Sequence, residues 1–455
     1  MVRFKLNNGN LQDTPRLTDI EFIEDEIKQF LMSERRQEMI NGEKYFHGKH
    51  DILRHKRQMI GNGGKLEEVD NLPNNRIVDN QYKKMVNQKT NYILGKPITI
   101  QAENAEYADR LTEIFNRTFA RLLKNIGKDS YNCGIGWLFV YYSISGDLSF
   151  RRFKPYEIIP GWKDEEHTEL DYAIRIYDIV EYEGKVANYE QKVEIYHACG
   201  ISRLDFDGTR LILKSDEPYF TYRGKGYNWI KVPLIPFKTN DNEIPLLRNV
   251  KSLQDGLNLI LSNFQNNMEE DTRNTILVVV NYDGENLGEF RKNLSTFGAV
   301  KVRSTDSGAG DVRSLKVEVN SENYRAIIDI FKKAIVENAM GYDAKCDLMG
   351  RSANQMNIRS MYSYIDLDAN EMETEFQASL ETLTEFIKFH TANFDKCSYE
   401  NEKAEFIFNR DMLMNETDII NNIRQSVGIL SNKTLIAQHP WVNDIQTELM
   451  RLKYN

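Results

Sequence analysis

The sequence predicts an α+β fold, arranged as the several parts of an elongated subunit. The length of 455 residues exceeds what a single compact core usually contains. Runs of β-branched and aromatic residues predict mostly strands between residues 156 and 237. Farther along the chain, two amphipathic helices flank a short α/β insert, and a long acidic helix follows.

Composition excludes several classes of protein. Hydrophobic residues make up 41% of the chain and charged residues 28%, which is typical of a protein with folded cores. No stretch approaches the roughly 20 consecutive apolar residues of a membrane-spanning helix, and the N-terminus lacks a signal peptide, so we expect folding in the cytoplasm. The net charge of -9 argues against a protein that grips nucleic acid tightly, because such binding depends on Lys and Arg.

The four cysteines, Cys133, Cys199, Cys346 and Cys397, are far apart and form no CxxC pair. Neither a zinc ribbon nor a disulfide framework is indicated. We expect buried, reduced thiols, and neither a metal ion nor a cofactor.

Apolar residues at helical spacing predict three helices in the first part of the chain. They cover residues 18–40, 76–94 and 105–126. The second is expected to end at Gly95, because Lys96 and Pro97 follow it. A β-hairpin is expected next, with strands 136–142 and 148–153. Together with the strands that follow, residues 1–243 are grouped as one mixed α/β domain.

Residues 43–64 form a basic stretch that ends in a glycine cluster. His47, His50 and His55 lie within it, but their spacing does not match a zinc signature, and the neighbouring Lys and Arg side chains repel a cation. We therefore expect an exposed basic loop here rather than a metal site.

The periodicity changes after residue 243. Residues 246–270 and 321–340 each carry a narrow apolar stripe, typical of helices that pack against other helices. Between them, strands are expected at residues 276–280, 299–303 and 315–319, and a short helix at residues 285–296. Two helices that flank a compact insert predict an antiparallel stalk with a cap at its end.

A loop at residues 341–354 precedes a long helical pattern at residues 360–387. That pattern contains several Asp and Glu but no Lys or Arg, so we expect a helix with one acidic face, exposed to solvent or to another subunit. Short helices are expected at residues 421–430, 431–438 and 444–452.

Several short segments, in their order and spacing, resemble the portal proteins of long-tailed bacteriophages. They are NRIVDNQY (75–82), YILGKPI (92–98), GIGW (134–137), YEIIP (156–160), VPLIPF (232–237), SNKTL (431–435) and PWVND (440–444). Together they extend over nearly the whole chain, which makes the resemblance specific. One departure is Ser352-Ala353, where many relatives have Ser-Gly at the start of the long helix.

The resemblance implies a particular domain organisation. It consists of a wing at residues 1–243, stem helices at 244–274 and 321–341, a clip at 275–320, a tunnel loop at 342–354, a long wing helix at 355–395, and a C-terminal wing strand with a helical crown at 396–455. The stem and the clip also follow from periodicity alone, whereas the other names depend on the resemblance.

The resemblance also implies a structural protein of the virion and not an enzyme. Such proteins form a ring of about twelve subunits at a capsid vertex. The ring is assembled in the host cytoplasm and conducts double-stranded DNA during packaging and ejection. The implied partners are other copies of the chain, the DNA, the terminase large subunit, the scaffold and major capsid proteins, and a head-completion adaptor, with no membrane.

Two sets of site residues follow from this resemblance. The DNA-channel candidates in the tunnel loop are Lys345, Met349, Arg351 and Asn354. Lys345 and Arg351 would make either transient phosphate contacts or ion pairs with acids of neighbouring subunits. The docking candidates in the clip are Arg291, Lys292, Arg303, Asp306 and Asp311, which would face the terminase and the head-completion proteins.

Other classes of protein fit the residues less well. The segment GNGGK at residues 61–65 lacks the spacing and the Ser or Thr of a nucleotide-binding loop, which argues against a packaging ATPase. The acidic residues form no recognisable two-metal constellation, and no GxSxG elbow is present, so a nuclease or hydrolase is the weaker hypothesis. Another phage head protein, such as an adaptor or minor capsid subunit, stays open as an alternative. The order helix, insert, helix favours a portal.

Overall fold

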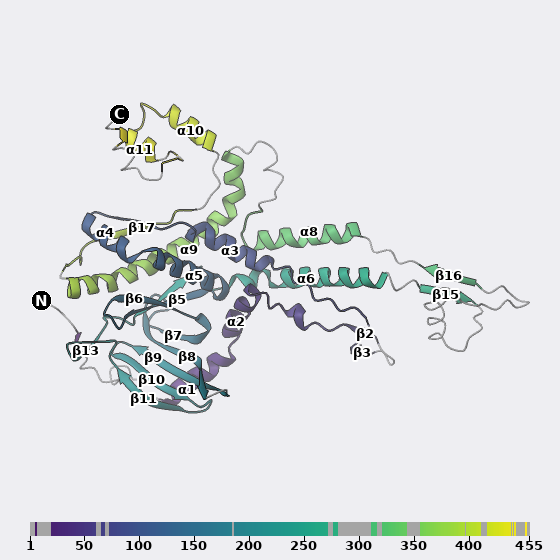
Figure 1. Cartoon of the computed structure of the whole chain (residues 1–455), viewed down its shortest axis with the longest axis horizontal. Coiled ribbons are helices and arrows are strands. Elements are labelled where there is room, and N and C mark those ends of the chain that lie inside the picture. The colour runs from purple at the N-terminus through teal and green to yellow at the C-terminus, as the bar shows by residue number, and fades with distance from the viewer. Residues whose placement is uncertain are drawn as a thin grey trace, which may run out of the picture. The chain divides into compact units, whose positions relative to one another are not determined.

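The structure is a computed structural model and describes most of the chain (Figure 1). The described residues are 5–6, 20–60, 65–68, 72–183, 186–271, 276–280, 311–315, 321–343, 355–395, 397–410, 416–437, 439, 441–442 and 451–452. They divide into two compact units. Unit 1 takes the described residues of 1–48, 80–251 and 335–455, and unit 2 takes those of 49–79 and 252–334.

Unit 1 begins with two helices where the sequence predicts one over residues 18–40. Helix α1 spans Ile20–Met32 and helix α2 spans Glu34–Phe46. Ser33 lies between the two helices. Its hydroxyl donates a hydrogen bond to the carbonyl of Phe30 (2.7 Å) and accepts one from the backbone N–H of Arg36 (3.2 Å). The side chain thus caps the start of α2, and this local capping outweighs the continuous apolar pattern.

Three further helices form the central layer of unit 1: α3 (Gln81–Leu94), α4 (Ala105–Ile114) and α5 (Arg117–Cys133). The prediction of one helix over residues 105–126 is wrong in its continuity, because Asn116 caps the start of α5. The prediction of a helix start at residue 76 is also wrong. Helix α3 begins at Gln81, after the N-cap Asn80, whose side chain accepts a hydrogen bond from the N–H of Lys83 (2.8 Å).

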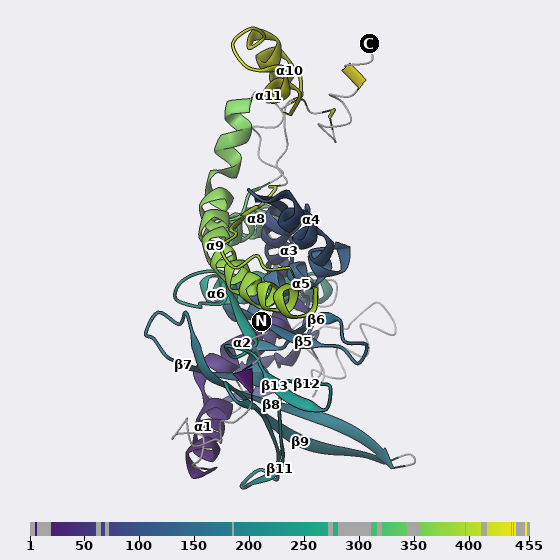
Figure 2. The same ribbon diagram turned by 90° about the vertical axis from the view of Figure 1, so that its left-hand side faces the viewer.

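Two antiparallel sheets confirm the predicted strand-rich region. The expected hairpin is present as β5 (Ile135–Tyr142) and β6 (Leu148–Phe153), and β14 (Leu234–Lys238) completes a sheet of order β14-β5-β6. The larger sheet has the order β11-β10-β9-β8-β7. Its strands are β7 (Ile158–Trp162), β8 (Leu170–Glu183), β9 (Val186–His197), β10 (Gly200–Phe206) and β11 (Leu211–Glu217). Helix α1 lies beside this sheet (Figure 2) and buries Ile23 and Ile27 against it.

Smaller strands complete unit 1. Strands β1 (Lys5–Leu6), β13 (Lys225–Asn228) and β12 (Phe220–Tyr222) form one sheet in that order. Strand β4 (Thr99–Ala102) pairs in antiparallel fashion with β17 (Ala404–Ile407), so a C-terminal segment joins the body of the unit.

The long acidic helix is confirmed as α9 (Gln355–His390), followed by a short π-helical turn at Thr391–Asp395. It packs on the small sheet, where Phe376 meets Phe237 with ring centroids 5.0 Å apart. Of the short C-terminal helices, α10 covers Glu416–Gln425 and α11 covers Asn432–Ala437. The first therefore begins before the predicted residue 421, and residues 444–450 of the third lie outside the described residues.

Unit 2 contains the predicted antiparallel stalk. Helices α6 (Leu246–Asp271) and α8 (Ser321–Asn338) run side by side (Figure 1), although their first and last turns, respectively, belong to unit 1. Phe264 meets Tyr324 with ring centroids 4.9 Å apart, and the side-chain amide of Asn267 donates to the Tyr324 hydroxyl (2.8 Å). Gly256 lies against the ring of Phe331, so the residue order confirms the antiparallel pairing.

The insert between the stalk helices is described in part. Strand β15 (Ile276–Val280) pairs in antiparallel fashion with β16 (Asp311–Leu315). The first agrees with the prediction. The second shares only Leu315 with the expected strand 315–319, whose other residues lie outside the described residues. The predicted helix 285–296 and strand 299–303 lie outside the described residues.

The described residues 49–60 and 65–68 contain more structure than the exposed loop predicted for residues 43–64. They include a 3-10 turn at Asp51–Arg54 and strands β2 (Gln58–Ile60) and β3 (Leu66–Glu68). His50 is buried, which corrects the expectation of an exposed basic loop at that position, while His47 and His55 are exposed. The side-chain amide of Asn258 on α6 lies 2.9 Å from Nδ1 of His50.

Cysteine burial follows the prediction in part. Cys133 is buried and Cys199 is half-buried, but Cys397 is exposed, which corrects the expectation that all the thiols are buried. Cys346 lies outside the described residues. Among the helices that the structure describes, none combines the length and apolar character needed to cross a bilayer.

Candidate functional site

The predicted DNA-channel residues Lys345, Met349, Arg351 and Asn354 lie outside the described residues. The same holds for the docking candidates Arg291, Lys292, Arg303 and Asp306. Asp311 is the first residue of β16 and pairs with Val280. The structure therefore describes the residues on either side of these segments, and two groups of buried polar contacts there define the candidate site.

The first group holds the chain where α8 ends, just before residues 344–354. The Lys89 ammonium donates a hydrogen bond to the carbonyl of Ala339 (2.7 Å), and the N–H of Gly341 donates to the carbonyl of Val336 (2.9 Å). Both bonds satisfy carbonyls in the last turn of the helix, which otherwise lack partners. The end of α8 is therefore fixed in place.

Gln88 holds the next residues. Its side-chain amide donates to the carbonyl of Tyr342 (2.8 Å), and its carbonyl oxygen accepts from the N–H of the same residue (3.1 Å). The Tyr342 ring lies 4.6 Å from the ring of Tyr362 on α9, which in turn stacks on Tyr92 of α3 at 5.5 Å. The residues that precede and follow segment 344–354 are thus brought together on α3.

Lys89 is fully buried and ion-paired with Asp368 of α9 (Nζ to Oδ1, 2.6 Å). Burial lowers the pKa of Lys89, whereas the carboxylate of Asp368 acts to raise it. The Tyr131 hydroxyl donates to the other oxygen of Asp368 (2.7 Å), and burial raises the pKa of that hydroxyl. This network ties α3, α5 and α9 to the end of α8.

A second carboxylate group on α9 binds Arg410, which follows β17. The Arg410 guanidinium contacts Asp366 (2.7 Å) and Glu373 (2.8 Å), and the Tyr92 hydroxyl donates to Asp366 (2.5 Å). Part of the acidic face of α9, expected to face solvent or another subunit, therefore binds groups within its own chain. Glu371 and Glu381 of the same helix are exposed.

The second group of contacts is a polar ladder along α6 in unit 2. Its members are Gln254, Asn258, Ser262 and Asn266, spaced four residues apart and all buried. Side-chain oxygens of the last three accept hydrogen bonds from the N–H groups of Asp79 (3.0 Å), Ile77 (3.0 Å) and Asn75 (2.7 Å), respectively. The Gln254 amide donates to the carbonyl of Asp79 (2.8 Å).

The ladder explains why residues 75–79 are not helical. Their alternate N–H groups bond to α6 side chains, which requires an extended backbone. An extended chain advances about 6.6 Å per two residues and a helix about 6.0 Å per four, so the two repeats match closely. The segment therefore braces the stalk along its length.

The roles of Gln88, Lys89 and the ladder were not predicted from the sequence. A signal was present for Lys89, which lies one turn from Met85, Val86 and Ile93 on the apolar face of a predicted helix. A lysine on such a face needs an acidic partner. For the ladder, the signal was a row of amide and hydroxyl residues at four-residue spacing on a helix otherwise patterned for packing.

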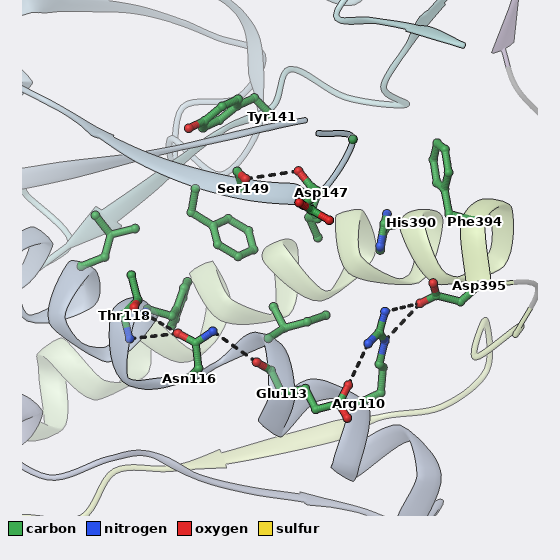
Figure 3. A pocket seen from close by; sticks show the side chains of 16 residues that line it. Arg110, Glu113, Asn116, Thr118, Tyr141, Asp147, Ser149, His390, Phe394 and Asp395 are labelled. Atoms are coloured by element: carbon green, nitrogen blue, oxygen red, sulfur yellow. Dashed lines mark hydrogen bonds and ion pairs between the residues drawn. The ribbon is translucent and has the colours of Figure 1, made fainter. Parts of the chain in front are cut away.

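A separate hollow of about 620 Å³ lies between α4, α5, the β5–β6 turn and the end of α9 (Figure 3). Arg110 spans it, contacting Glu113 (2.8 Å) and Asp395 (2.5 Å). The Ser149 hydroxyl donates to the carbonyl of Asp147, and His390 lies 3.2 Å from the Tyr142 hydroxyl. Among the residues that the structure describes in this hollow, no serine is hydrogen-bonded to a histidine, as a serine nucleophile and its base would be. Carboxylates neutralise the Arg110 guanidinium.

The described residues define a structural framework. Unit 2 holds a helical stalk braced by an extended segment, and unit 1 is an α/β body with buried ion pairs around residues 335–342. The sequence matches the family model for "Phage portal protein, SPP1 Gp6-like" over residues 25–454. The chain belongs to this family of phage portal proteins.

Two curated relatives agree with this assignment. The portal protein of Bacillus phage SPP1 is 27% identical over 439 residues, which cover 94% of this chain and 85% of the relative. The portal protein of Clostridium phage phiCD119 is 26% identical over 426 residues, covering 90% of this chain and 91% of the relative.

Proposed function

We propose that this chain is the subunit of a portal ring at a capsid vertex, through which double-stranded DNA enters and leaves. The match to the portal family over nearly the whole chain carries the proposal. Its parts would be the wing, stem, clip, tunnel loop and crown, with the residue ranges that the resemblance implies. A ring of about twelve copies follows from the family, and repeated head-to-tail contacts close such a ring.

In this ring, the tunnel loop at residues 342–354 would face the DNA. The Gln88 and Lys89 contacts support this part of the proposal, since they hold the start of the segment on α3. A loop held at its base can place Lys345 and Arg351 at a fixed distance from the channel axis, with Met349 and Asn354 beside them. Weak phosphate contacts of this kind position DNA without reading its sequence.

The clip would dock other proteins. Arg291, Lys292, Arg303, Asp306 and Asp311 are the proposed contacts for the terminase large subunit and later for the head-completion adaptor. Scaffold and major capsid proteins would contact the ring during assembly in the host cytoplasm. The role is structural, with no reaction catalysed by the chain itself.

The test replaces Lys345 and Arg351 by Ala and measures ring assembly, DNA packaging and DNA retention in assembled heads. We expect intact rings with impaired packaging or retention. The matched control replaces Arg117 and Lys225 by Ala, two exposed cations on α5 and β13 that form no ion pair with any described residue. Normal packaging and retention in the first variant would refute the tunnel contacts, and a protein that forms no ring would refute the portal function.

A further inference from the structure

Four basic side chains lie near one another in unit 1, in a chain whose net charge is -9, and are called the basic ridge below. The basic ridge consists of Lys83 on α3, Lys124 and Lys128 on α5, and Arg152 on β6. Arg152 contacts Asp129 (3.3 Å), but the three lysines form no ion pair with any described residue. Partial burial lowers the pKa of Lys128, and the nearby charges of Lys124, Lys83 and Arg152 lower it further.

An acidic groove lies elsewhere in unit 1, as a hollow of about 660 Å³. Its carboxylates come from Glu165 and Glu166, from Asp241, and from Glu375 on α9. Glu371 lies one turn before Glu375 and is exposed. Burial raises the pKa of Glu371, and the charges of Asp368 and Asp241 raise it further.

Three basic side chains also line this groove, and all three contact a single buried carboxylate. The side chain of Glu243 is 4% exposed and pairs with Arg35, with His167 Nδ1 (2.7 Å) and with Lys238 Nζ (3.4 Å). Burial acts to raise the pKa of Glu243, but these neighbours lower it. The five acids named above form no ion pair with any described residue, so the groove is left negative.

The two surfaces lie at opposite edges of the small sheet, whose order is β14-β5-β6. Residues 235, 236 and 238 of β14 line the groove, whereas Arg152 of the ridge belongs to β6. The ridge is net positive although Asp129 lies beside Arg152, and the groove is net negative although Arg35 and Lys238 line it. A two-fold contact of either surface with itself would therefore be repulsive. Complementary surfaces at different places on one subunit suit a head-to-tail contact, which can close into a ring.

We propose that the basic ridge of one subunit docks against the acidic groove of the next copy in the ring. The inference rests on the proposed portal function and names the surfaces that would bring neighbours together. A second copy is the favoured occupant because the complementary surface is present on the same chain. Nucleic acid at the ridge would leave the acidic groove without a partner.

Charge reversal in two separate variants tests this contact. The ridge variant is Lys124→Glu/Lys128→Glu and the groove variant is Glu371→Lys/Glu375→Lys. Either variant alone removes the charge complementarity, since the ridge then carries two positive and two negative side chains, or the groove two positive and three negative ones. We therefore expect at least a tenfold lower ring fraction in sedimentation velocity at 0.15 M salt. In an equimolar mixture, each surface meets its complement on the other variant, and we expect rings of alternating subunits to recover.

A control with the same charge change, Arg117→Glu/Lys225→Glu, should assemble as the wild type does. Far-UV circular dichroism and thermal melting of each monomer confirm that the variants fold. Single variants that assemble normally, or a mixture no better than its components, would overturn the interface. Intact rings that lose DNA packaging in the ridge variant would also overturn it, in favour of a DNA contact. A wild-type protein without rings would refute the portal function itself.

Discussion

The buried ion pair between Lys89 and Asp368 gives the most direct test of how the end of α8 is held. In the variant Lys89→Met, the apolar length of the side chain is retained and the ammonium is lost. Among the described residues, Asp368, whose side chain is 15% exposed, then keeps the Tyr131 hydroxyl as its close donor. The carbonyl of Ala339 loses the hydrogen bond from Lys89 as well.

The expected cost follows from that geometry. Removing one partner of a buried ion pair costs about 3–5 kcal/mol, because the remaining charge stays buried without compensation. Replacing both partners by apolar groups, as in Lys89→Met/Asp368→Leu, removes that unpaired charge. The double variant should therefore lose at least about 1 kcal/mol less than the sum of the two single variants.

Equilibrium urea unfolding, followed by circular dichroism, measures these free energies. Lys84→Met is the matched control, since Lys84 lies on the same helix and is exposed. It should change the free energy of unfolding by no more than about 0.5 kcal/mol. A loss below about 1 kcal/mol in Lys89→Met would show that the pair does not hold the helix end.

Three further predictions concern other parts of the framework. Asn258→Leu should lower the free energy of unfolding by about 2–4 kcal/mol in urea titrations. It removes the buried amide that accepts from the N–H of Asp79 and contacts Nδ1 of His50. The control Gln265→Leu, at an exposed position on the same helix, should change little. Gly134→Ala should lower the free energy of unfolding by at least about 3 kcal/mol, since a Cβ there would lie 1.9 Å from the carbonyl oxygen of Glu243. The control Gly146→Ala, at a similar positive φ but in open space, should lower it by only about 1 kcal/mol in the same assay. Burial raises the pKa of Asp129 to about 7, although Arg152 acts to lower it. The folded state then binds more protons than the unfolded state between about pH 4 and 7, so stability should fall by about 2–4 kcal/mol as the pH rises through that range and stay level above it. Asp129→Asn should flatten this profile in urea titrations at pH 4.5 and 7.5, and an unchanged slope would contradict the assigned pKa.

Elements with a strong repeating pattern were predictable from the sequence. The stalk helices α6 and α8, the acidic helix α9 and the β5–β6 hairpin appear where periodicity places them. Each buries one side against a neighbouring element, so the apolar spacing reports the packing directly. Helix ends were less predictable, because a single side chain such as Ser33 or Asn116 can stop a continuing pattern by bonding to the backbone.

The candidate site was less predictable, because its residues act across long sequence separations. Gln88 and Lys89 hold residues 342 and 339, and their own helix gives no sign of which carbonyl they bind. His50 shows the same limit, since its local sequence is basic and glycine-rich but its ring meets Asn258 on a stalk helix. Local pattern indicates that a buried polar residue needs a partner, and only the tertiary fold supplies the partner's identity.

The ladder on α6 accounts both for the wrongly predicted helix start at residue 76 and for the motif NRIVDNQY. Residues 75–79 have an apolar pattern that continues into α3, yet their N–H groups bond to Asn266, Ser262 and Asn258. The helical and extended repeats differ by about 0.6 Å per step, so the mismatch reaches about 1.2 Å over the two steps that separate three bonds. A longer ladder would lose hydrogen-bond geometry at its ends. The motif NRIVDNQY can therefore be short: three alternate N–H groups satisfy the ladder, and Asn80 then starts α3.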